Sequence, residues 1–208
     1  MMGILTRGTP VERAFADLDK ARETVARWQA EQAAKRAELS DLESRIGAEV
    51  LDDESAAERL ADQAVKLRAQ IDVAARTERA ATDRVTDAGR AVLRAYAGEQ
   101  QANADRLRSQ VEQRQAKTDA MLKAVSEWEG GVSYTPVTPS SLEVQGAGQS
   151  GVSYKIPLTV ALRNQMTGLE AKARQYEGYA DAPAEQVAEQ VERLAGRLHT
   201  PAPATVAG

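Results

Sequence analysis

The sequence predicts an elongated all-α protein, in which a long antiparallel coiled-coil hairpin carries a small β-hairpin or loop insert and is followed by two C-terminal helices. Two observations lead to this fold class. Residues 55–129 contain no proline, and their apolar residues recur every three or four positions, as on one face of a helix. Residues 131–157 interrupt this pattern with Gly, Ser, Thr, Pro and Val, which are typical of strands and turns.

The composition favours the same class. Only 4% of the 208 residues are aromatic, whereas 28% are charged. A compact globule of this size usually contains more Phe, Ile and Leu. Abundant Ala, Glu, Arg, Gln and Leu suit long helices that bury one narrow seam and leave their other faces in water. The chain has no cysteine, which excludes disulfides and thiolate metal sites.

Charge and hydropathy bear on partners and location. The net charge is −4, and both signs are interspersed along the predicted helices, which argues against a basic stripe for phosphate groups. No window approaches the roughly 18 apolar residues of a membrane span. The apolar run in residues 1–7 is too short for a signal peptide. We therefore expect a cytoplasmic protein that binds neither nucleic acid nor membranes.

The first helix is predicted over residues 10–46, after a flexible leader of residues 1–9. Thr9 is placed as the N-cap, with Glu12 completing a capping box. Gly47 is expected to end the helix, and residues 48–53 to form an acidic loop. The heptad positions are occupied by Val11, Ala14, Leu18, Ala21, Val25, Trp28, Leu39, Leu42 and Ile46, with Gln32 and Lys35 as polar interruptions.

The second helix is predicted over residues 54–129, so that residues 10–129 form the hairpin. Its seam contains Leu60, Ala64, Leu67, Ile71, Ala74, Ala81, Val85, Ala88 and Val92, with Glu78 as the polar exception. The connection between the two helices is short, which makes them antiparallel neighbours. Gly89 and Gly98 are two places where the second helix could be creased.

The first helix is too short to cover the second helix beyond about residue 90. The uncovered part has an apolar stripe whose phase slips by about four residues near Gly98. A helical pattern resumes over residues 158–198, broken at Asp181-Ala182-Pro183, and precedes a disordered tail of residues 199–208. This C-terminal segment is long enough to cover the stripe within one chain. A second copy of the chain is the alternative cover.

The insert, residues 130–157, repeats the letters Gly-Val-Ser-Tyr, ending at Tyr134 and at Tyr154. Two extended segments flanking residues 146–148 are expected to form a β-hairpin. The two tyrosines are expected to pair across that hairpin, with contact to a partner as the alternative.

The candidate contacts with a partner or a second copy are apolar and aromatic residues of these segments. They are Leu107, Val111, Leu122, Val125, Trp128, Tyr134, Tyr154, Leu162, Met166 and Leu169.

No catalytic, cofactor or metal site is predicted. His199 is the single histidine, and it has no partners for a metal site or a triad. Residues 146–151 match G-x-G-x-x-G by letter, but no helix is predicted to follow them. Residues 136–139 have P-x-x-P spacing, for which a rigid linker is the default. Carboxylates alternate with arginines, as on solvated helix faces. We expect no enzyme activity and no small-molecule substrate.

The leading hypothesis is a non-enzymatic structural or assembly protein, a coiled-coil scaffold or spacer that oligomerises and organises other proteins. This organisation is similar in a general way to phage assembly proteins such as scaffolds, and to bacterial coiled-coil adaptors. The alternative is a protein-binding module that recognises a partner through residues 131–157. A third hypothesis is association with nucleic acid or a membrane surface through the arginine-bearing face at Arg90, Arg94, Arg106, Arg108 and Arg114.

Overall fold

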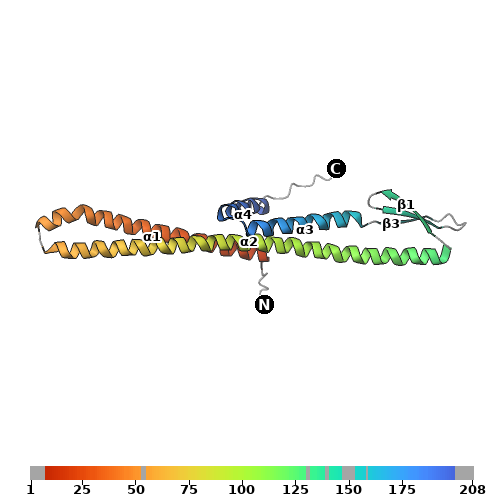
Figure 1. Cartoon of the computed structure of the whole chain (residues 1–208), viewed down its shortest axis with the longest axis horizontal. Helices are drawn as coiled ribbons and strands as arrows, with labels where there is room; N and C mark the ends of the chain where they lie inside the picture. Colours follow the sequence, from red (N-terminus) through yellow and green to blue (C-terminus); the bar gives the residue numbers. More distant parts are fainter. Residues whose placement is uncertain are drawn as a thin grey trace, which may run out of the picture. The chain divides into compact units, whose positions relative to one another are not determined.

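The computed structural model describes residues 8–52, 55–129, 132–138, 141–146, 153–157 and 159–199 (Figure 1). Its elements in chain order are α1 (Pro10–Asp52), α2 (Ala56–Glu129), β1 (Val132–Thr138), β2 (Ser141–Gly146), β3 (Ser153–Pro157), α3 (Val160–Ala180) and α4 (Ala184–His199). Helices account for most of the described residues, and α1 and α2 are 43 and 74 residues long. The prediction of a largely helical chain with long helices is confirmed.

The chain divides into two compact units, which are described separately. Unit 1 comprises the residues up to Leu93 together with those from Tyr179 onward, so it contains α1, the first part of α2, and α4. Unit 2 runs from Arg94 to Gly178 and contains the rest of α2, the three strands and most of α3.

The start of α1 follows directly from the local sequence. The backbone N–H of Glu12 donates to Thr9 Oγ1 at 3.1 Å, and the backbone N–H of Thr9 donates to Glu12 Oε2 at 2.6 Å. These two bonds make up the reciprocal pattern of a capping box, which satisfies backbone donors that the helix itself leaves without a partner. The predicted start at Pro10 is confirmed.

The end of α1 differs from the prediction. Gly47 does not end the helix, which continues through Asp52, so the predicted boundary at residue 46 is wrong, and the predicted loop of residues 48–53 is wrong for residues 48–52. Residue 53 lies outside the described residues. A glycine inside a helix costs only about 1 kcal/mol relative to alanine. Beyond Gly47, Val50 packs against the buried cluster that joins α1 to α2. Partial burial of Val50 offsets part of the cost of the glycine.

Within unit 1, α1 runs antiparallel to the first part of α2 (Figure 1). Arg68 of α2 donates to Glu43 at 2.8 Å, and Gln29 of α1 donates to Glu78 at 3.0 Å, so the numbering rises on one helix as it falls on the other. The buried cluster consists of Leu42, Ala56, Leu60, Ala64 and Leu67, with Leu39, Ile46 and Val50 packed at its margin. On α2 its members are separated by four and three residues, which is heptad spacing.

Helix α2 continues through both glycines at which a crease was considered. A Cβ atom at Gly89 would lie 3.1 Å from Val187 Cγ1 and 3.6 Å from Val191 Cγ2, whereas nothing lies within 4 Å of a Cβ at Gly98. Gly89 therefore has a packing role, because the missing side chain lets α4 approach the backbone of α2 closely.

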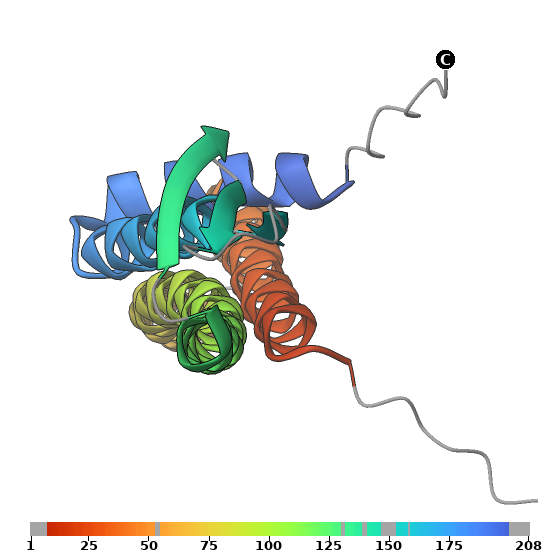
Figure 2. The same ribbon diagram turned by 90° about the vertical axis from the view of Figure 1, so that its right-hand side faces the viewer.

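Helix α4 completes the core of unit 1 by lying across α1 and α2 (Figure 2). Val187, Val191 and Leu194 are at most 2% exposed, as expected for the apolar face of an amphipathic helix, although Leu198 is 51% exposed. An ion pair between Arg22 and Glu192 joins α4 to α1. The chain therefore uses α4 in unit 1, and does not extend it along the distal part of α2 as the length argument suggested.

In unit 2, α3 runs antiparallel to the second part of α2 (Figure 1). Arg163 donates to Gln115 at 3.3 Å, and the ring centroids of Tyr96 and Tyr176 lie 4.6 Å apart at an interplanar angle of 67°. The buried hydrophobic residues among those described are Ala97, Ala104, Val111, Ala173 and Tyr176. Part of the distal stripe is thus covered by α3 of the same chain.

The three strands form one antiparallel sheet in the order β1-β2-β3. Tyr134 of β1 is in register with Val144 of β2, and Tyr154 of β3 is in register with the same residue. The expected direct pairing of the two tyrosines is therefore wrong, because β2 lies between their strands. The expected turn at residues 147 and 148 lies outside the described residues, as do Gly130, Gly131 and the tail after residue 199.

Candidate interaction surfaces

The predicted contact residues of α2 and α3 lie in unit 2. Val111 is buried, while the side chains of Leu107, Leu122, Leu162, Met166 and Leu169 are half-buried. On α3, Leu162, Met166 and Leu169 precede Ala173 and Tyr176 by alternating steps of four and three residues. All five therefore lie on the side of α3 that faces α2. The stripe therefore pairs α3 with α2 within the chain, and its half-buried side chains stay partly exposed to solvent.

The other predicted contacts are placed less completely. Val125 and Trp128 belong to the last turns of α2, but their side chains lie outside the described residues. Tyr134 and Tyr154 occupy matching register positions on β1 and β3, and their side chains are likewise outside the description. His199 is the last residue of α4.

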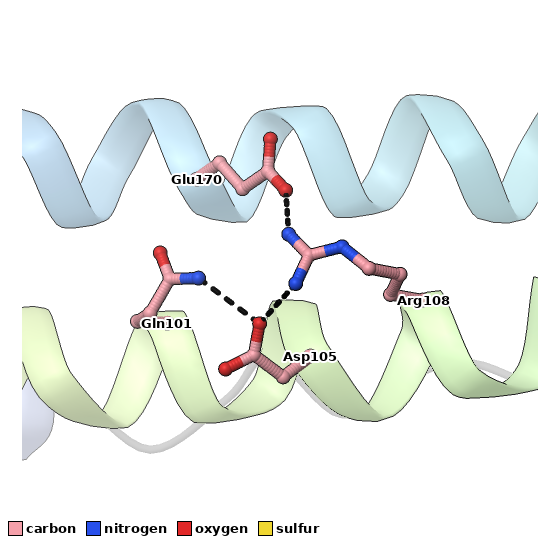
Figure 3. A network of polar contacts seen from close by, with 4 residues as sticks. All are labelled: Gln101, Asp105, Arg108 and Glu170. Carbon is pink, nitrogen blue, oxygen red and sulfur yellow. Dashed lines mark hydrogen bonds and ion pairs between the residues drawn. The ribbon is translucent and has the colours of Figure 1, made fainter.

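A polar network links α2 to α3 on the surface of unit 2 (Figure 3). Arg108 donates to Glu170 of α3 at 2.6 Å and to Asp105 of α2 at 2.5 Å, and Gln101 donates to the same Asp105 oxygen at 3.1 Å. The hydrogen bond to Glu170, and then the one to Asp105, raise the pKa of Arg108 above its usual value. Arg108 therefore aligns the two helices rather than offering a free charge to a ligand.

Two further arginines of the predicted basic face also contact an acidic or an amide side chain. Arg90 forms an ion pair with Asp87 at 3.0 Å, and Arg106 donates to Asn103 at 3.2 Å. Arg108 is engaged with carboxylates on two helices, as described above. This interspersion of charge disfavours binding to a polyanion.

A polar layer interrupts the apolar seam between α1 and α2. Gln32 occupies a heptad core position and is only 8% exposed, and Gln29 hydrogen-bonds across the seam to Glu78. Lys35 donates to both carboxylate oxygens of Glu38, at 2.9 and 3.0 Å, and this hydrogen bonding raises the pKa of Lys35. The predicted interruption is present. The contribution of Gln29 was missed, because it lies outside the core heptad positions.

A shallow groove of about 520 Å³ follows the boundary of α1 and α2 in unit 1. Its walls are formed by Trp28, Glu31, Lys35, Ala69, Gln70, Val73 and Ala74. The guanidinium carbon of Arg27 lies 5.9 Å from the ring centroid of Trp28, which is within cation–π range. Trp28 was expected to be a packing residue, but it is only half-buried, with the exposed Val73 at the other wall.

The exposure of Val73 and Val65 was not predicted from the sequence. They are 60% and 62% exposed and lie outside the heptad core positions of α2. Two valines at outward positions of a helix whose core positions are otherwise regular are the signal that would have identified them.

The described residues include no group of three or more His, Cys, Asp and Glu side chains placed to hold a metal ion. None of the described helices carries an apolar stretch long enough to cross a bilayer. No protein-family model matches the chain, and no match was found among curated proteins or solved structures.

Proposed function

We propose that the chain is a non-enzymatic structural or assembly protein, a coiled-coil scaffold or spacer that self-associates and organises other proteins. The observation that supports this proposal is the long antiparallel pair in unit 1, formed by α1 and the first part of α2, which we call the arm. Helix α1 has 43 residues, a length of about 65 Å at 1.5 Å per residue. The average helix of a globular protein has only about 11–12 residues. An arm of this length holds bound partners at a fixed spacing.

The packing of the arm supports a coiled-coil type of contact. The buried residues of α2 in this cluster are separated by steps of four or three residues. The polar layer at Gln32 and Glu78 has the character of the polar residues that fix register in coiled coils. A pair of helices with a single seam leaves most side chains of both helices in water. Those outer faces are available for lateral contacts with further helices.

The test of self-association is sedimentation equilibrium of the full chain over a wide range of concentrations. We expect the mean mass to rise from that of the 22.4 kDa chain toward that of a dimer or larger assembly. A mass that stays at 22.4 kDa up to the highest concentration would contradict the oligomerising scaffold. The helix content, followed by circular dichroism, serves as the control that the sample is folded.

A second candidate function is a protein-binding module presented by residues 131–157. It is favoured by one observation: in the order β1-β2-β3, both outer strands have a backbone edge that no other described strand covers. Such an edge can accept an extended segment of a partner as an added strand. Replacing residues 131–157 by a short Gly-Ser linker separates the two functions. Loss of partner binding with intact self-association would favour the module, and loss of self-association would exclude it.

A further inference from the structure

Unit 1 is built from two stretches of chain that are far apart in the sequence. Helix α4 belongs to unit 1, although the chain reaches it only after passing through unit 2. Val187, Val191 and Leu194 of α4 are at most 2% exposed, and they follow the four- and three-residue spacing with which a helix lays one face into a groove. Helix α4 therefore completes a core that the rest of unit 1 leaves open.

The surface that receives α4 is formed by both helices of the arm (Figure 2). On α2, the missing side chain of Gly89 makes room for α4, since a Cβ atom there would lie 3.1 Å from Val187 Cγ1 and 3.6 Å from Val191 Cγ2. On α1, Arg22 forms an ion pair with Glu192 of α4. We call this surface, around Gly89 and Arg22, the α4 site. It recognises α4 through one apolar contact and one charged contact.

We propose that copies of the chain associate by exchanging α4, so that α4 of each copy occupies the α4 site of the other. The proposal rests on the self-association in the proposed function, and it names the segment and the surface that carry it. Exchange reproduces between two copies every contact that α4 makes within one chain. It therefore needs no further complementary surface on the molecule.

The connection between α3 and α4 is the only segment whose backbone has to change for the exchange. It consists of Asp181-Ala182-Pro183, in which the backbone N–H of Ala182 donates to the carbonyl oxygen of Tyr179 at 3.2 Å. Pro183 has no N–H, and in a continuous helix its ring would collide with the carbonyl group of Tyr179, so α3 and α4 stay separate helices. A connection this short favours exchange, because a small change in its backbone angles sends α4 to another copy.

The balance between the two arrangements depends on protein concentration. Within one chain, the connection presents α4 to its site at an effective concentration on the order of millimolar. The contacts of α4 are the same in both arrangements, so they do not favour either one. The exchanged dimer is therefore expected to accumulate as the concentration of the chain rises, and each dimer contains two exchanged helices.

Two single-cysteine chains test where α4 binds. The natural chain has no cysteine, so Gly89→Cys and Val187→Cys each introduce one thiol. A sulfur in the place of Val187 Cγ1 would lie close enough to the new Cβ at position 89 for a disulfide. The two chains are unfolded together in urea, refolded at high concentration and mildly oxidised. We expect a disulfide that joins one chain of each kind, identified by mass spectrometry of the digested protein.

Gly98→Cys replaces Gly89→Cys in the matched control, because Gly98 is on the same helix with nothing within 4 Å of its Cβ position. We expect the mixed disulfide to form at least about tenfold more slowly in the control, since no docked helix holds its two thiols together. Equal rates for the two mixtures would overturn the exchange.

Both cysteines in one chain test whether the exchange carries the self-association. The double variant Gly89→Cys/Val187→Cys is oxidised while dilute, which fixes α4 in its own α4 site. We expect the oxidised chain to sediment at 22.4 kDa at concentrations where the reduced chain forms dimers. An oxidised chain that dimerises as readily as the reduced one would overturn the proposal. Circular dichroism of both forms verifies that they are helical.

Charge reversal of the ion pair gives a test without cysteines. Mixing an Arg22→Glu chain with a Glu192→Arg chain places like charges together whenever α4 stays in its own copy, and opposite charges in both contacts of an exchanged mixed dimer. We expect native mass spectrometry to find mixed dimers above their random share. Mixed dimers at the random share would contradict the exchange.

The outcomes separate this proposal from the proposed function. A natural chain that sediments as a dimer, while the oxidised double variant dimerises equally well, would overturn the exchange of α4 and leave the scaffold function standing. A natural chain that stays monomeric would overturn both.

Discussion

Gly89 and Gly98 are both glycines of α2, but their surroundings differ. The first is buried beneath α4, with Val187 and Val191 close to its missing Cβ, and the second has open space around it. Sequence alone treats both as weak points, because glycine lowers helix propensity wherever it occurs. The structure assigns a packing role to one of them only.

This contrast yields a prediction for alanine substitutions at the two positions. Gly98→Ala should raise the free energy of unfolding by up to about 1 kcal/mol, through helix propensity. Gly89→Ala receives the same benefit, but its methyl group would lie 3.1 Å from Val187 Cγ1, so part or all of the gain should be lost. Urea denaturation of both variants measures the difference. Equal gains at the two positions would contradict the close packing of α4 on Gly89.

The capping box at Thr9 gives a second prediction at the residue scale. Thr9→Ala removes the Oγ1 acceptor for the backbone N–H of Glu12, and should lower the free energy of unfolding by about 1 kcal/mol. Thr9→Ser keeps a hydroxyl at the same place and serves as the matched control. An alanine variant as stable as the serine variant would show that water replaces the cap at no cost.

At the scale of elements, the sequence predicted the start of α1 but not its end. The start of α1 depends on Thr9 and Glu12, which are close neighbours in the chain, so local pattern was sufficient. The end of α1 depends on Val50 packing against α2, which is tertiary information. The same reason explains α4. A helical pattern was predicted up to residue 198, but the packing of Val187, Val191 and Leu194 in the core of unit 1 was not.

The pairing of α3 with α2 gives a prediction at this scale. Tyr176 is 5% exposed and meets Tyr96 edge to face, so Tyr176→Ala should cost about 3 kcal/mol of stability through lost packing and a cavity. Tyr176→Phe keeps the ring and should remain close to the natural chain. Arg108→Ala is expected to have a much smaller effect, because its ion pairs are solvent-exposed. Thermal unfolding that ranks Arg108 above Tyr176 would contradict this account.

At the scale of the whole molecule, the candidate surface shows what a single sequence can and cannot supply. Eight of the ten predicted contacts were chosen from apolar helix stripes, and the other two, Tyr134 and Tyr154, from the insert. Helix α3 covers part of the distal stripe of α2 within the same chain. The exposed positions of Val65 and Val73 were missed, although both valines lie outside the heptad core positions that the sequence predicts for α2. A heptad pattern identifies the buried face of a helix, and an apolar residue outside the core positions is then expected to be exposed.

The division into two units gives the last prediction. Each unit has a buried core of its own, around Leu194 in unit 1 and around Tyr176 in unit 2, so each should open in a separate step. Leu194→Ala should therefore speed amide hydrogen exchange in α4 and the first half of α1 while leaving α3 protected as before. Tyr176→Ala should speed exchange in α3 and leave α1 unchanged. Hydrogen exchange followed by mass spectrometry measures both responses in the full chain. If either substitution sped exchange equally throughout the chain, the two units would form a single cooperative structure, and the arm formed by α1 and α2 could not stay folded while α3 opens.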